Sequence, residues 1–365
     1  MAYSASIQVN LGQRSYEVKI GSGLLDRFGE VLAESLAPRR AALITNDEIW
    51  SLHGGRLGKS LDGSCIRYQK ITVPDGESAK SLPIAEEVYG QLIEAGFERG
   101  EPIVAFGGGV VGDLAGFLAA TYLRGVPLVH VPTTLLAQID SSIGGKVAIN
   151  HPRGKNLIGM FYQPTFVFSD VDVLRTLDLS QLRNGLAEAI KYGFIWENGP
   201  LDYIEEHLDA ILDADAAVIA PLVRDCSAIK ARIVEIDERD RGLRAILNYG
   251  HTFGHAIETS SHYAFSHGEA ISIGMHFAAR LSAKLGMVDE SVVQRHDKLL
   301  TRAGLPTKAS RVNIESVIRA MSVDKKRQGG ENLFVLLEGI GRPVVRPVPD
   351  DVVIELIVEL TGVVH

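Results

Sequence analysis

Two histidines four residues apart are the residues whose types and spacing most directly suggest chemistry. His251 and His255 lie in the stretch NYGHTFGHAIE, residues 248–258. In a helix of about 3.6 residues per turn, residues at i and i+4 project from the same face. Two imidazoles on one face can share a divalent cation such as Zn²⁺, or can act as one metal ligand and one proton carrier. The spacing does not choose between these roles, and two hydrogen-bonded core histidines would show the same spacing.

Polar residues near this pair favour a functional site over a core position. Arg244 and Asn248 precede His251 within two helical turns, and the run SHGE at residues 266–269 follows it. Polar groups at this density in an otherwise apolar segment commonly converge on a ligand.

Glu188 and Lys191 form another charged pair, one helical turn apart in LAEAIK, residues 186–191. A surface ion pair at this spacing, worth about 0.5 kcal/mol or less, is one interpretation. The apolar flanks favour the other interpretation, in which both side chains face inward at a site.

A glycine-rich run follows the expected strand Ile103–Phe106. Residues 107–113 read GGGVVGD, which satisfies GxGxxG at a strand-to-helix junction. Glycine lets the backbone approach a pyrophosphate, and a helix N-terminus offers free N–H groups. The usual acidic residue about 20 residues later is absent, because Thr133 and Thr134 stand there. A ribose would then need acids from earlier strand ends, namely Asp47, Asp75 or Glu77; a tight turn without a ligand is the alternative.

Several cations stand beside glycines, in what we expect to be turns. Lys146, Lys155 and Arg124 have such neighbours, and Lys230 and the run Asp324-Lys325-Lys326 add further cations. The chain carries a formal net charge of -8, so an anionic ligand would need a local cluster of this kind. The same net charge gives no basis for nucleic acid or an anionic membrane as a partner.

Length and composition are those of an ordinary enzyme. With 365 residues, 46% hydrophobic and 22% charged, the chain is expected to form two domains. No apolar run reaches the roughly 18 residues of a membrane span, and the two cysteines, Cys65 and Cys226, stand outside any CxxC pattern. We therefore expect a soluble cytoplasmic protein with reduced thiols.

The order of expected elements predicts the fold class. A hairpin at residues 6–20 precedes buried strands at 41–45, 71–73, 103–106 and 128–131, with helices at 23–36, 84–95 and 114–123. This alternation predicts an α/β domain with a doubly wound, mainly parallel sheet. Beyond residue 174 the periodicity is helical, except at residues 333–337, where we expect a strand or a hairpin. We predict an N-terminal α/β domain over residues 1–178 and a mainly α-helical domain over residues 179–365.

The motifs together resemble those of the 3-dehydroquinate synthase family of sugar phosphate cyclases. The segments that carry the resemblance cover most of residues 70–340: GGGVVGDLAGFLAATYLRG, VPTTLLAQIDSSIGGKVAIN, GKNLIGMFYQP, GLAEAIKYG, LRAILNYGHTFGHAIE, HGEA and DKKRQGGENLFVLL. The resemblance implies an NAD-binding N-terminal domain, a helical C-terminal domain, a divalent metal, usually zinc with cobalt as an alternative, and a homodimer.

The resemblance also implies roles for individual residues. The metal ligands would be Glu188, His251 and His267, and His255 would relay a proton near the leaving phosphate. The substrate phosphate would be held by Lys146, Asn156 and Lys325, with Arg124 reaching in from the partner subunit. The substrate hydroxyls and carboxylate would be positioned by Lys191, Lys230, Arg244, Asn248 and Asp140. NAD would contact Asp75, Gly76, Glu77, Lys80, Gly108, Gly109, Asp113, Thr133, Thr134, Lys146, Lys155 and Thr176.

The reaction implied is the conversion of 3-deoxy-D-arabino-heptulosonate 7-phosphate to 3-dehydroquinate and phosphate, in the shikimate pathway of aromatic amino acid biosynthesis. It would proceed by transient oxidation with NAD, phosphate elimination, reduction and an intramolecular aldol step.

Three alternative functions were weighed against this one. A 2-deoxy-scyllo-inosose synthase binds no substrate carboxylate, which Arg244, Asn248 and Lys230 argue against. A metal-dependent polyol dehydrogenase would reduce NAD with net turnover, and a non-catalytic NAD-binding protein could dispense with Glu188, Lys191 and the histidines.

Overall fold

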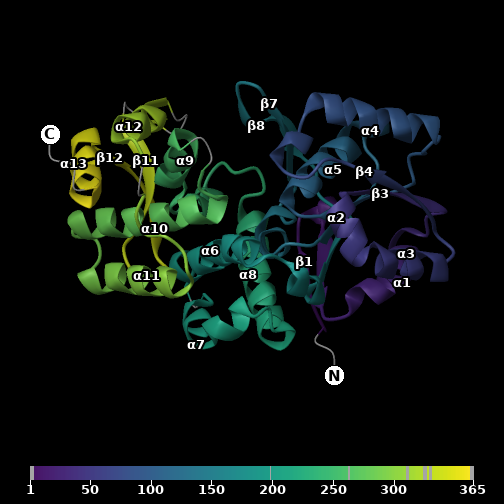
Figure 1. Ribbon diagram of the computed structural model, residues 1–365, viewed down its shortest axis with the longest axis horizontal. Coiled ribbons are helices and arrows are strands. Elements are labelled where there is room, and N and C mark those ends of the chain that lie inside the picture. The colour runs from purple at the N-terminus through teal and green to yellow at the C-terminus, as the bar shows by residue number, and fades with distance from the viewer. Residues whose placement is uncertain are drawn as a thin grey trace. The chain divides into compact units, whose positions relative to one another are not determined.

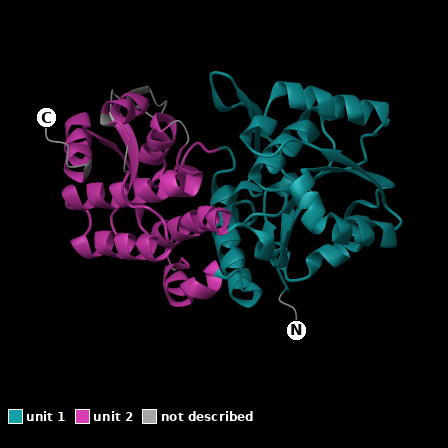
Figure 2. Cartoon of the chain, in the orientation of Figure 1, with its two compact units in different colours: residues 1–178, 213–239 teal, residues 179–212, 240–365 magenta. Residues whose placement is uncertain are grey.

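The structure is a computed structural model that describes residues 4–197, 199–261, 264–309, 312–323, 327–328 and 331–361. The chain divides into two compact units, one of residues 1–178 and 213–239 and the other of residues 179–212 and 240–365 (Figure 2). The first division falls at residue 178, the boundary expected from the sequence. Residues 213–239, however, belong to the first unit, whereas the prediction assigned them to the second domain.

The first unit is built on a seven-stranded sheet in the order β1-β2-β9-β6-β5-β3-β4. Of these strands, β1, β3 and β4 are labelled in Figure 1. All neighbouring strands pair in parallel except β1 and β2, which form the expected antiparallel hairpin at one edge. The strands are β1 (Ser4–Val9), β2 (Tyr16–Gly21), β3 (Arg40–Thr45), β4 (Arg67–Thr72), β5 (Ile103–Gly107), β6 (Leu128–Pro132) and β9 (Phe166–Asp170). The predicted doubly wound, mainly parallel sheet is confirmed.

The strand order creates a switch point between β3 and β5. The chain runs from β3 outward to β4, then returns across β3 to β5 and continues through β6 to β9. Connections therefore leave the carboxyl ends of β3 and β5 in opposite directions, and doubly wound sheets bind their ligands in the crevice that this produces. The glycine-rich run lies at the carboxyl end of β5, which is the position a nucleotide would require.

The α-helices of the described part of the first unit are α1 (Phe28–Leu36), α2 (Asp47–Ile49), α3 (Gly55–Gly63), α4 (Leu82–Glu94), α5 (Gly109–Thr121) and α8 (Ala216–Ile236). Helix α5 is almost wholly apolar, and its residues 114–120 are buried. It packs against β5, β6 and β7, so the helix that follows the glycine run is a core element.

Helix α8 packs against β1 and β2 of the first unit. Ser227 Oγ donates to Gln138 O at 3.2 Å, and Lys230 forms an ion pair with Asp140. The helical periodicity expected beyond residue 174 is confirmed here, because residues Ala216–Ile236 form a helix. Periodicity shows that a helix has an apolar face but not which core covers that face, which is why the domain assignment missed this segment.

A separate two-stranded hairpin contains the lysines that we expected in turns. Strand β7 (Lys146–His151) pairs antiparallel with β8 (Gly154–Phe161), and Lys146 stands opposite Phe161. Val147 and Ile149 are buried while Lys146 and His151 are exposed, which is strand alternation. The expectation of loops at Lys146 and Lys155 was wrong, because the flanking glycines are compatible with a hairpin as well as with a loop.

The second unit is mainly helical, as predicted. Its helices are α6 (Leu179–Ile195), α7 (Leu201–Leu212), α9 (His251–Ser260), α10 (His267–Lys284), α11 (Glu290–Arg302), α12 (Ile314–Val323) and α13 (Asp350–Thr361). A small antiparallel sheet of β10 (Arg327–Gln328), β11 (Glu331–Leu337) and β12 (Pro343–Val348) contains the expected strand at 333–337. In the ranges that the structure describes, no helix is both long and apolar enough to cross a membrane.

Candidate active site

Three side chains of the second unit that are far apart in sequence meet at a buried carboxylate. Glu188 lies in the middle of α6, whereas His251 and His267 are the first residues of α9 and α10. Glu188 Oε1 is 3.4 Å from His251 Nε2 and 3.3 Å from His267 Nε2. The ligand atoms of all three residues lie within 4.8 Å of one another, which makes them a candidate metal site.

Glycines bring the three helices close enough for this meeting. A Cβ added at Gly274 of α10 would lie 1.9 Å from the carbonyl oxygen of Gly250, immediately before α9. A Cβ at Gly268 would lie 2.6 Å from Cα of Asn184 on α6. Gly250 itself has φ +79°, a conformation that favours glycine. The backbone contacts that these glycines permit place both imidazoles beside Glu188.

The histidines are held with Nε2 toward Glu188. His251 Nδ1 donates to the carbonyl oxygen of Tyr249 at 3.1 Å, so the neutral ring presents its Nε2 lone pair to the site. His267 Nδ1 faces Glu258 Oε1 at 3.5 Å. Ser266 and Glu269 form a reciprocal capping box that fixes the first turn of α10, where His267 stands.

The charges at this site fit a bound cation. Burial raises the pKa of Glu188, but Lys191 and His267 outweigh it and hold that pKa well below its usual range. Burial, with Lys191 next in effect, lowers the pKa of His251 well below its ordinary value. Burial also lowers the pKa of His267, but Glu188 and Glu258 together raise it to about 10. The pocket thus stabilises positive charge at His267 despite burial.

The donor set and spacing also fit zinc. Glu188 Oε1 is buried and has no hydrogen bond of good geometry to any described residue, although a lone pair of His251 faces it. Tetrahedral Zn²⁺ with bonds of roughly 2.0–2.1 Å separates its ligand atoms by about 3.3 Å. The two Glu188–histidine distances match that separation, so the residues present suit a divalent metal.

His255 lies apart from this set. Its side chain is exposed, its ring stands edge-on to His251 with centroids 5.2 Å apart, and its Nε2 lies 3.9 Å from Glu258 Oε2. His255, Glu258 and His267 form a second group whose ligand atoms lie close together. Among the described residues, neither group contains both His251 and His255, so the geometry does not support a metal shared by this i, i+4 pair.

Other expected substrate residues of the second unit are in or near helices. Lys191 is buried, forms an ion pair with Glu188, and has its Nζ 5.2 Å from the ring centroid of Tyr192. Arg244 is buried in the helical turn Leu243–Asn248, and Asn248 Nδ2 donates to Ala245 O at 3.1 Å. Lys325 lies outside the described residues.

In the first unit, expected nucleotide-binding residues gather at the carboxyl ends of the parallel strands. Asn46 follows β3 and donates through Nδ2 to Asp75 Oδ1 at 2.9 Å. Among the residues that the structure describes, no side chain forms a capping hydrogen bond at Gly108, the residue that precedes α5. A Cβ at Gly108 would lie 3.0 Å from Thr134 Cγ2, so a side chain there would fill this turn. Thr133 follows β6, and its N–H donates to Gly107 O at 3.0 Å.

A buried lysine organises the neighbouring polar cluster. Lys80 Nζ donates to Asp113 Oδ2 at 2.6 Å, contacts Asn156 Oδ1, and lies 3.5 Å from Glu77 Oε1. Burial raises the pKa of Asp113, and Lys80 opposes that shift. The expected contacts Asp75, Gly76, Lys146, Lys155, Arg124 and Thr176 are exposed.

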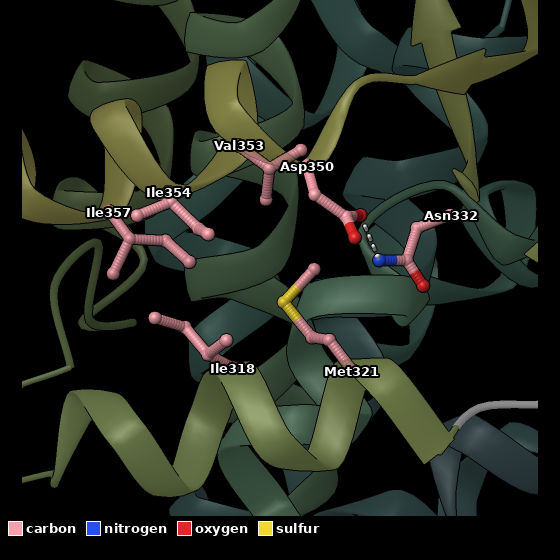
Figure 3. A pocket seen from close by; sticks show the side chains of 7 residues that line it. All are labelled: Ile318, Met321, Asn332, Asp350, Val353, Ile354 and Ile357. Atoms are coloured by element: carbon pink, nitrogen blue, oxygen red, sulfur yellow. Dashed lines mark hydrogen bonds between the residues drawn. The ribbon is translucent and has the colours of Figure 1, made fainter. Parts of the chain in front are cut away.

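Asp140 and Lys230, both expected to contact substrate, pair with each other within the first unit. A separate pocket in the second unit contains none of the expected site residues (Figure 3). Its mainly apolar lining comes from Ile318, Met321, Asn332, Asp350, Val353, Ile354 and Ile357. Pocket shape alone therefore does not indicate the active site, whereas side-chain chemistry does.

Comparison with known families identifies the chain. Residues 70–184 match the family described as 3-dehydroquinate synthase N-terminal, and residues 185–327 match 3-dehydroquinate synthase C-terminal. A curated 3-dehydroquinate synthase of Pelotomaculum thermopropionicum is 48% identical over 343 residues, covering 93% of this chain and 92% of the relative. The chain belongs to the 3-dehydroquinate synthase family. The activity is that of a 3-dehydroquinate synthase, a carbon–oxygen lyase.

Another 3-dehydroquinate synthase, from Dehalococcoides mccartyi, is 46% identical and covers 93% of this chain and 95% of its own length. Among solved structures, a 2-epi-5-epi-valiolone synthase from Streptomyces hygroscopicus subsp. jinggangensis, with NAD⁺ and Zn²⁺ bound, is 27% identical. It covers 97% of this chain and 98% of its own, with a TM-score of 0.88. A 2-deoxy-scyllo-inosose synthase complexed with carbaglucose-6-phosphate, NAD⁺ and Co²⁺ is 28% identical, with a TM-score of 0.86 and coverage of 97% and 100%.

These similarities distinguish 3-dehydroquinate synthase from the alternative functions by sequence identity and structural likeness. The inosose synthase shares the fold but much less sequence than the curated 3-dehydroquinate synthases do. A probable glycerol dehydrogenase from Sinorhizobium meliloti is 19% identical with a TM-score of 0.63, which shows a related fold alone. The predicted family is confirmed.

Sequence reasoning missed several groups that the structure places at these sites. Glu258 faces His267, the Tyr249 carbonyl accepts from His251, and His53 Nε2 lies 2.8 Å from Thr176 Oγ1. Glu258 stands one helical turn after His255, so its spacing was a usable signal. The contact between His251 and Tyr249 could not be predicted from residue types, because the acceptor is a backbone carbonyl oxygen.

Proposed function

We propose that the chain converts 3-deoxy-D-arabino-heptulosonate 7-phosphate to 3-dehydroquinate and phosphate with NAD and a divalent metal, preferably Zn²⁺, with Co²⁺ as a substitute. The observation that carries the metal assignment is the buried Glu188 oxygen that faces Nε2 of both His251 and His267. When bound, the metal supplies positive charge that lowers the pKa of a substrate hydroxyl, and NAD supplies reversible oxidation of the carbon that bears it.

In this proposal, the second unit binds the metal and the reacting part of the substrate. Glu188, His251 and His267 hold the metal, and Lys191 keeps Glu188 ionised. The buried guanidinium of Arg244 suits a carboxylate, with which it can form two parallel hydrogen bonds. Asn248 and Lys191 orient hydroxyl groups. His255, exposed and outside the metal set, moves a proton near the departing phosphate.

The first unit supplies NAD binding and most of the described phosphate-binding cations. Backbone N–H groups at the start of α5, from Gly108 and Gly109, hold the pyrophosphate. The ion pair between Lys80 and Asp113 stabilises the turn at Gly108 and Gly109. Asp140 and Lys230 position the substrate as a pair. The remaining NAD contacts are Asp75, Gly76, Glu77, Thr133, Thr134, Lys146, Lys155 and Thr176.

The substrate phosphate requires several cations in a chain of net charge -8. Lys146 and Asn156 of the β7–β8 hairpin bind it, and Lys325 completes the site. Arg124 is exposed and follows Leu123 in a left-handed turn, φ 68° and 48° respectively. We propose that the protein is a homodimer in which Arg124 acts on the partner's substrate.

The decisive experiment mixes purified protein with Zn²⁺, a catalytic amount of NAD⁺ and the heptulosonate phosphate. Phosphate release and absorbance of NADH are followed together. We expect phosphate to accumulate over many turnovers without net NADH, because the cofactor is regenerated. Stoichiometric NADH would indicate a dehydrogenase, and no phosphate would contradict the proposal. A hexose phosphate without a carboxylate serves as the control substrate, and we expect no phosphate release from it.

A further inference from the structure

No role was expected for Glu258, although its carboxylate faces His267, one of the three candidate metal ligands. It lies on α9, its side chain is 12% exposed, and its two oxygens face different imidazoles. Oε1 is 3.5 Å from His267 Nδ1, and Oε2 is 3.9 Å from His255 Nε2. His267 therefore stands between two carboxylates, with Nε2 toward Glu188 and Nδ1 toward Glu258.

The chemistry of imidazole determines which ring nitrogen of His267 can bind a metal. A neutral ring has one N–H and one lone pair, so a donor at Nδ1 leaves the lone pair at Nε2. Glu188 faces Nε2 and Glu258 faces Nδ1. When a metal takes the Nε2 lone pair, the remaining ring proton is at Nδ1, where the ionised carboxylate of Glu258 accepts it. The Nε2 lone pair then points toward Glu188 Oε1, where the metal is proposed to bind.

His251 offers an internal comparison. Its Nδ1 donates to a backbone carbonyl, that of Tyr249, at 3.1 Å. Both histidines thus present Nε2, but one is held by a neutral acceptor and the other by a charged one. A carboxylate behind an imidazole fixes the ring and raises its basicity as a ligand more than a carbonyl does.

We propose that Glu258 is a positioning residue that orients His267 and strengthens it as a metal ligand, an inference that rests on the metal site proposed above. Glu258 acts through His267 and does not itself contact the metal. The alternative is that Glu258, His255 and His267 bind a second cation, since their ligand atoms also lie within 4.8 Å of one another. That alternative requires the Nδ1 lone pair, which His267 does not provide while its Nε2 holds the metal and its Nδ1 carries the proton.

The test titrates metal-free full-length protein with Zn²⁺ and measures both stoichiometry and Kd. Glu258→Ala should weaken Zn²⁺ binding by about 10- to 100-fold, the range typical of lost outer partners of metal ligands. Glu258→Gln keeps the volume and an acceptor oxygen but loses the charge, so its loss should be smaller. The visible absorption of the Co²⁺-loaded protein should shift in Glu258→Ala, because ligand basicity and ring orientation change.

Glu269→Ala is the matched control. Glu269 also stands within the first turn of α10, where its Oε2 accepts from Ser266 N at 2.8 Å. Removing it breaks the capping box beside His267 but leaves the partner of Nδ1 in place. It should lower the melting temperature while leaving the Co²⁺ spectrum and Zn²⁺ affinity close to wild type.

If Glu258→Ala folds, any of three outcomes would overturn the inference. The first is a Glu258→Ala protein with wild-type affinity and spectrum, and the second is an equal loss of affinity in Glu269→Ala. The third is two Zn²⁺ per wild-type chain falling to one in Glu258→Ala, which would make Glu258 a ligand. If Glu258→Ala does not fold, a wild-type affinity in Glu258→Gln together with an unshifted Co²⁺ spectrum overturns it. A wild-type chain that binds no metal would instead refute the proposed metal site itself.

Discussion

The proposed metal site of the second unit, formed by Glu188, His251 and His267, and the proposed nucleotide site at the strand ends of the first unit would bind through different kinds of atoms. At the proposed metal site, the contacts come from side chains on α6, α9 and α10, and glycines serve only to bring those helices together. At the end of β5, the proposed binding groups are backbone N–H groups, and glycine is itself the binding element. A site of the first kind fails when a functional group is removed, whereas a site of the second kind fails when a side chain is added.

The two regions also differ in how their charges are held. Glu188 and Lys191 are each 1% exposed and pair with each other. In the first unit, Lys146, Lys155 and Arg124 are exposed, while Lys80 is 4% exposed. Salt screens exposed charges but affects buried ones much less. We therefore expect ionic strength to weaken anion binding by these exposed cations more than it affects the Glu188–Lys191 ion pair.

Of the substitutions considered, Glu188→Gln should lower activity most. It should impair metal binding in the second unit without changing NAD binding in the first. The amide removes the anionic ligand and leaves the buried Lys191 without its counter-ion. Zn²⁺ affinity should fall by more than about 100-fold, beyond the range for an outer partner, and kcat by on the order of 10³-fold. NAD affinity, measured by fluorescence titration, should stay unchanged. Glu290→Gln, at an exposed position on α11, is the control; loss of NAD and metal together would contradict the separation.

His255→Ala should have the next largest effect and should sharpen the difference between the two histidines. Because His255 lies outside the Glu188 set, Zn²⁺ affinity should stay within about 3-fold of wild type. Loss of a proton carrier should lower kcat by about 10²-fold. His151→Ala, at an exposed histidine on β7, serves as control. Metal loss equal to that of Glu188→Gln would restore the model in which His251 and His255 share the cation.

The sequence predicted the first unit well where one physical signal was sufficient. The buried runs that became β3, β5 and β6 are continuously apolar because both faces of a parallel strand are covered. The hairpin β7–β8 was missed because its glycines were interpreted as loop residues. A Cβ at Gly159 would lie 2.3 Å from Val147 O, so that glycine is needed for close strand pairing.

The candidate site was predictable in its residue types but not in its pairings. Spacing placed His251 and His255 on one face, whereas Glu188, His251 and His267 meet only because three helices pack through glycines. Family resemblance, rather than spacing, gave that set. Glu258 was missed although its spacing from His255 was a usable signal, because its contact with His267 Nδ1 forms only when the chain folds. The strand or hairpin expected at residues 333–337 is the antiparallel pair β11–β12, whereas helix α13 was not predicted.

Lys80→Met should have a smaller effect, confined to the first unit. It removes the buried partner of Asp113, so the pKa of that carboxyl should rise further and the turn at Gly108 should lose support. NAD affinity should fall about 10-fold, about 1.4 kcal/mol, with Zn²⁺ affinity unchanged. Lys155→Met is the matched control at an exposed position. Its effect should disappear at high salt while that of Lys80→Met persists; equal salt dependence would contradict the difference in burial.

The smallest predicted effect concerns buried histidines, which occur in both units. Burial lowers the pKa of His130 on β6 to about 4 and that of His296 on α11 to about 3. Each folded-state pKa lies below the unfolded value of about 6.5, so the unfolded chain takes up the proton first as pH falls. Stability is therefore full above about pH 6.5 and is lost as pH falls toward the folded pKa.

His130→Leu isolates this contribution in the first unit. Between pH 7 and pH 5.5, one such histidine should cost about 1 kcal/mol of unfolding free energy, so the variant should lose about that much less than wild type. Urea unfolding followed by fluorescence at both pH values measures the difference. His151→Leu, at an exposed histidine, should retain the wild-type pH dependence. An unchanged pH dependence in His130→Leu would mean that the pKa of His130 is the same in the folded and unfolded chain, which would contradict the lowering by burial.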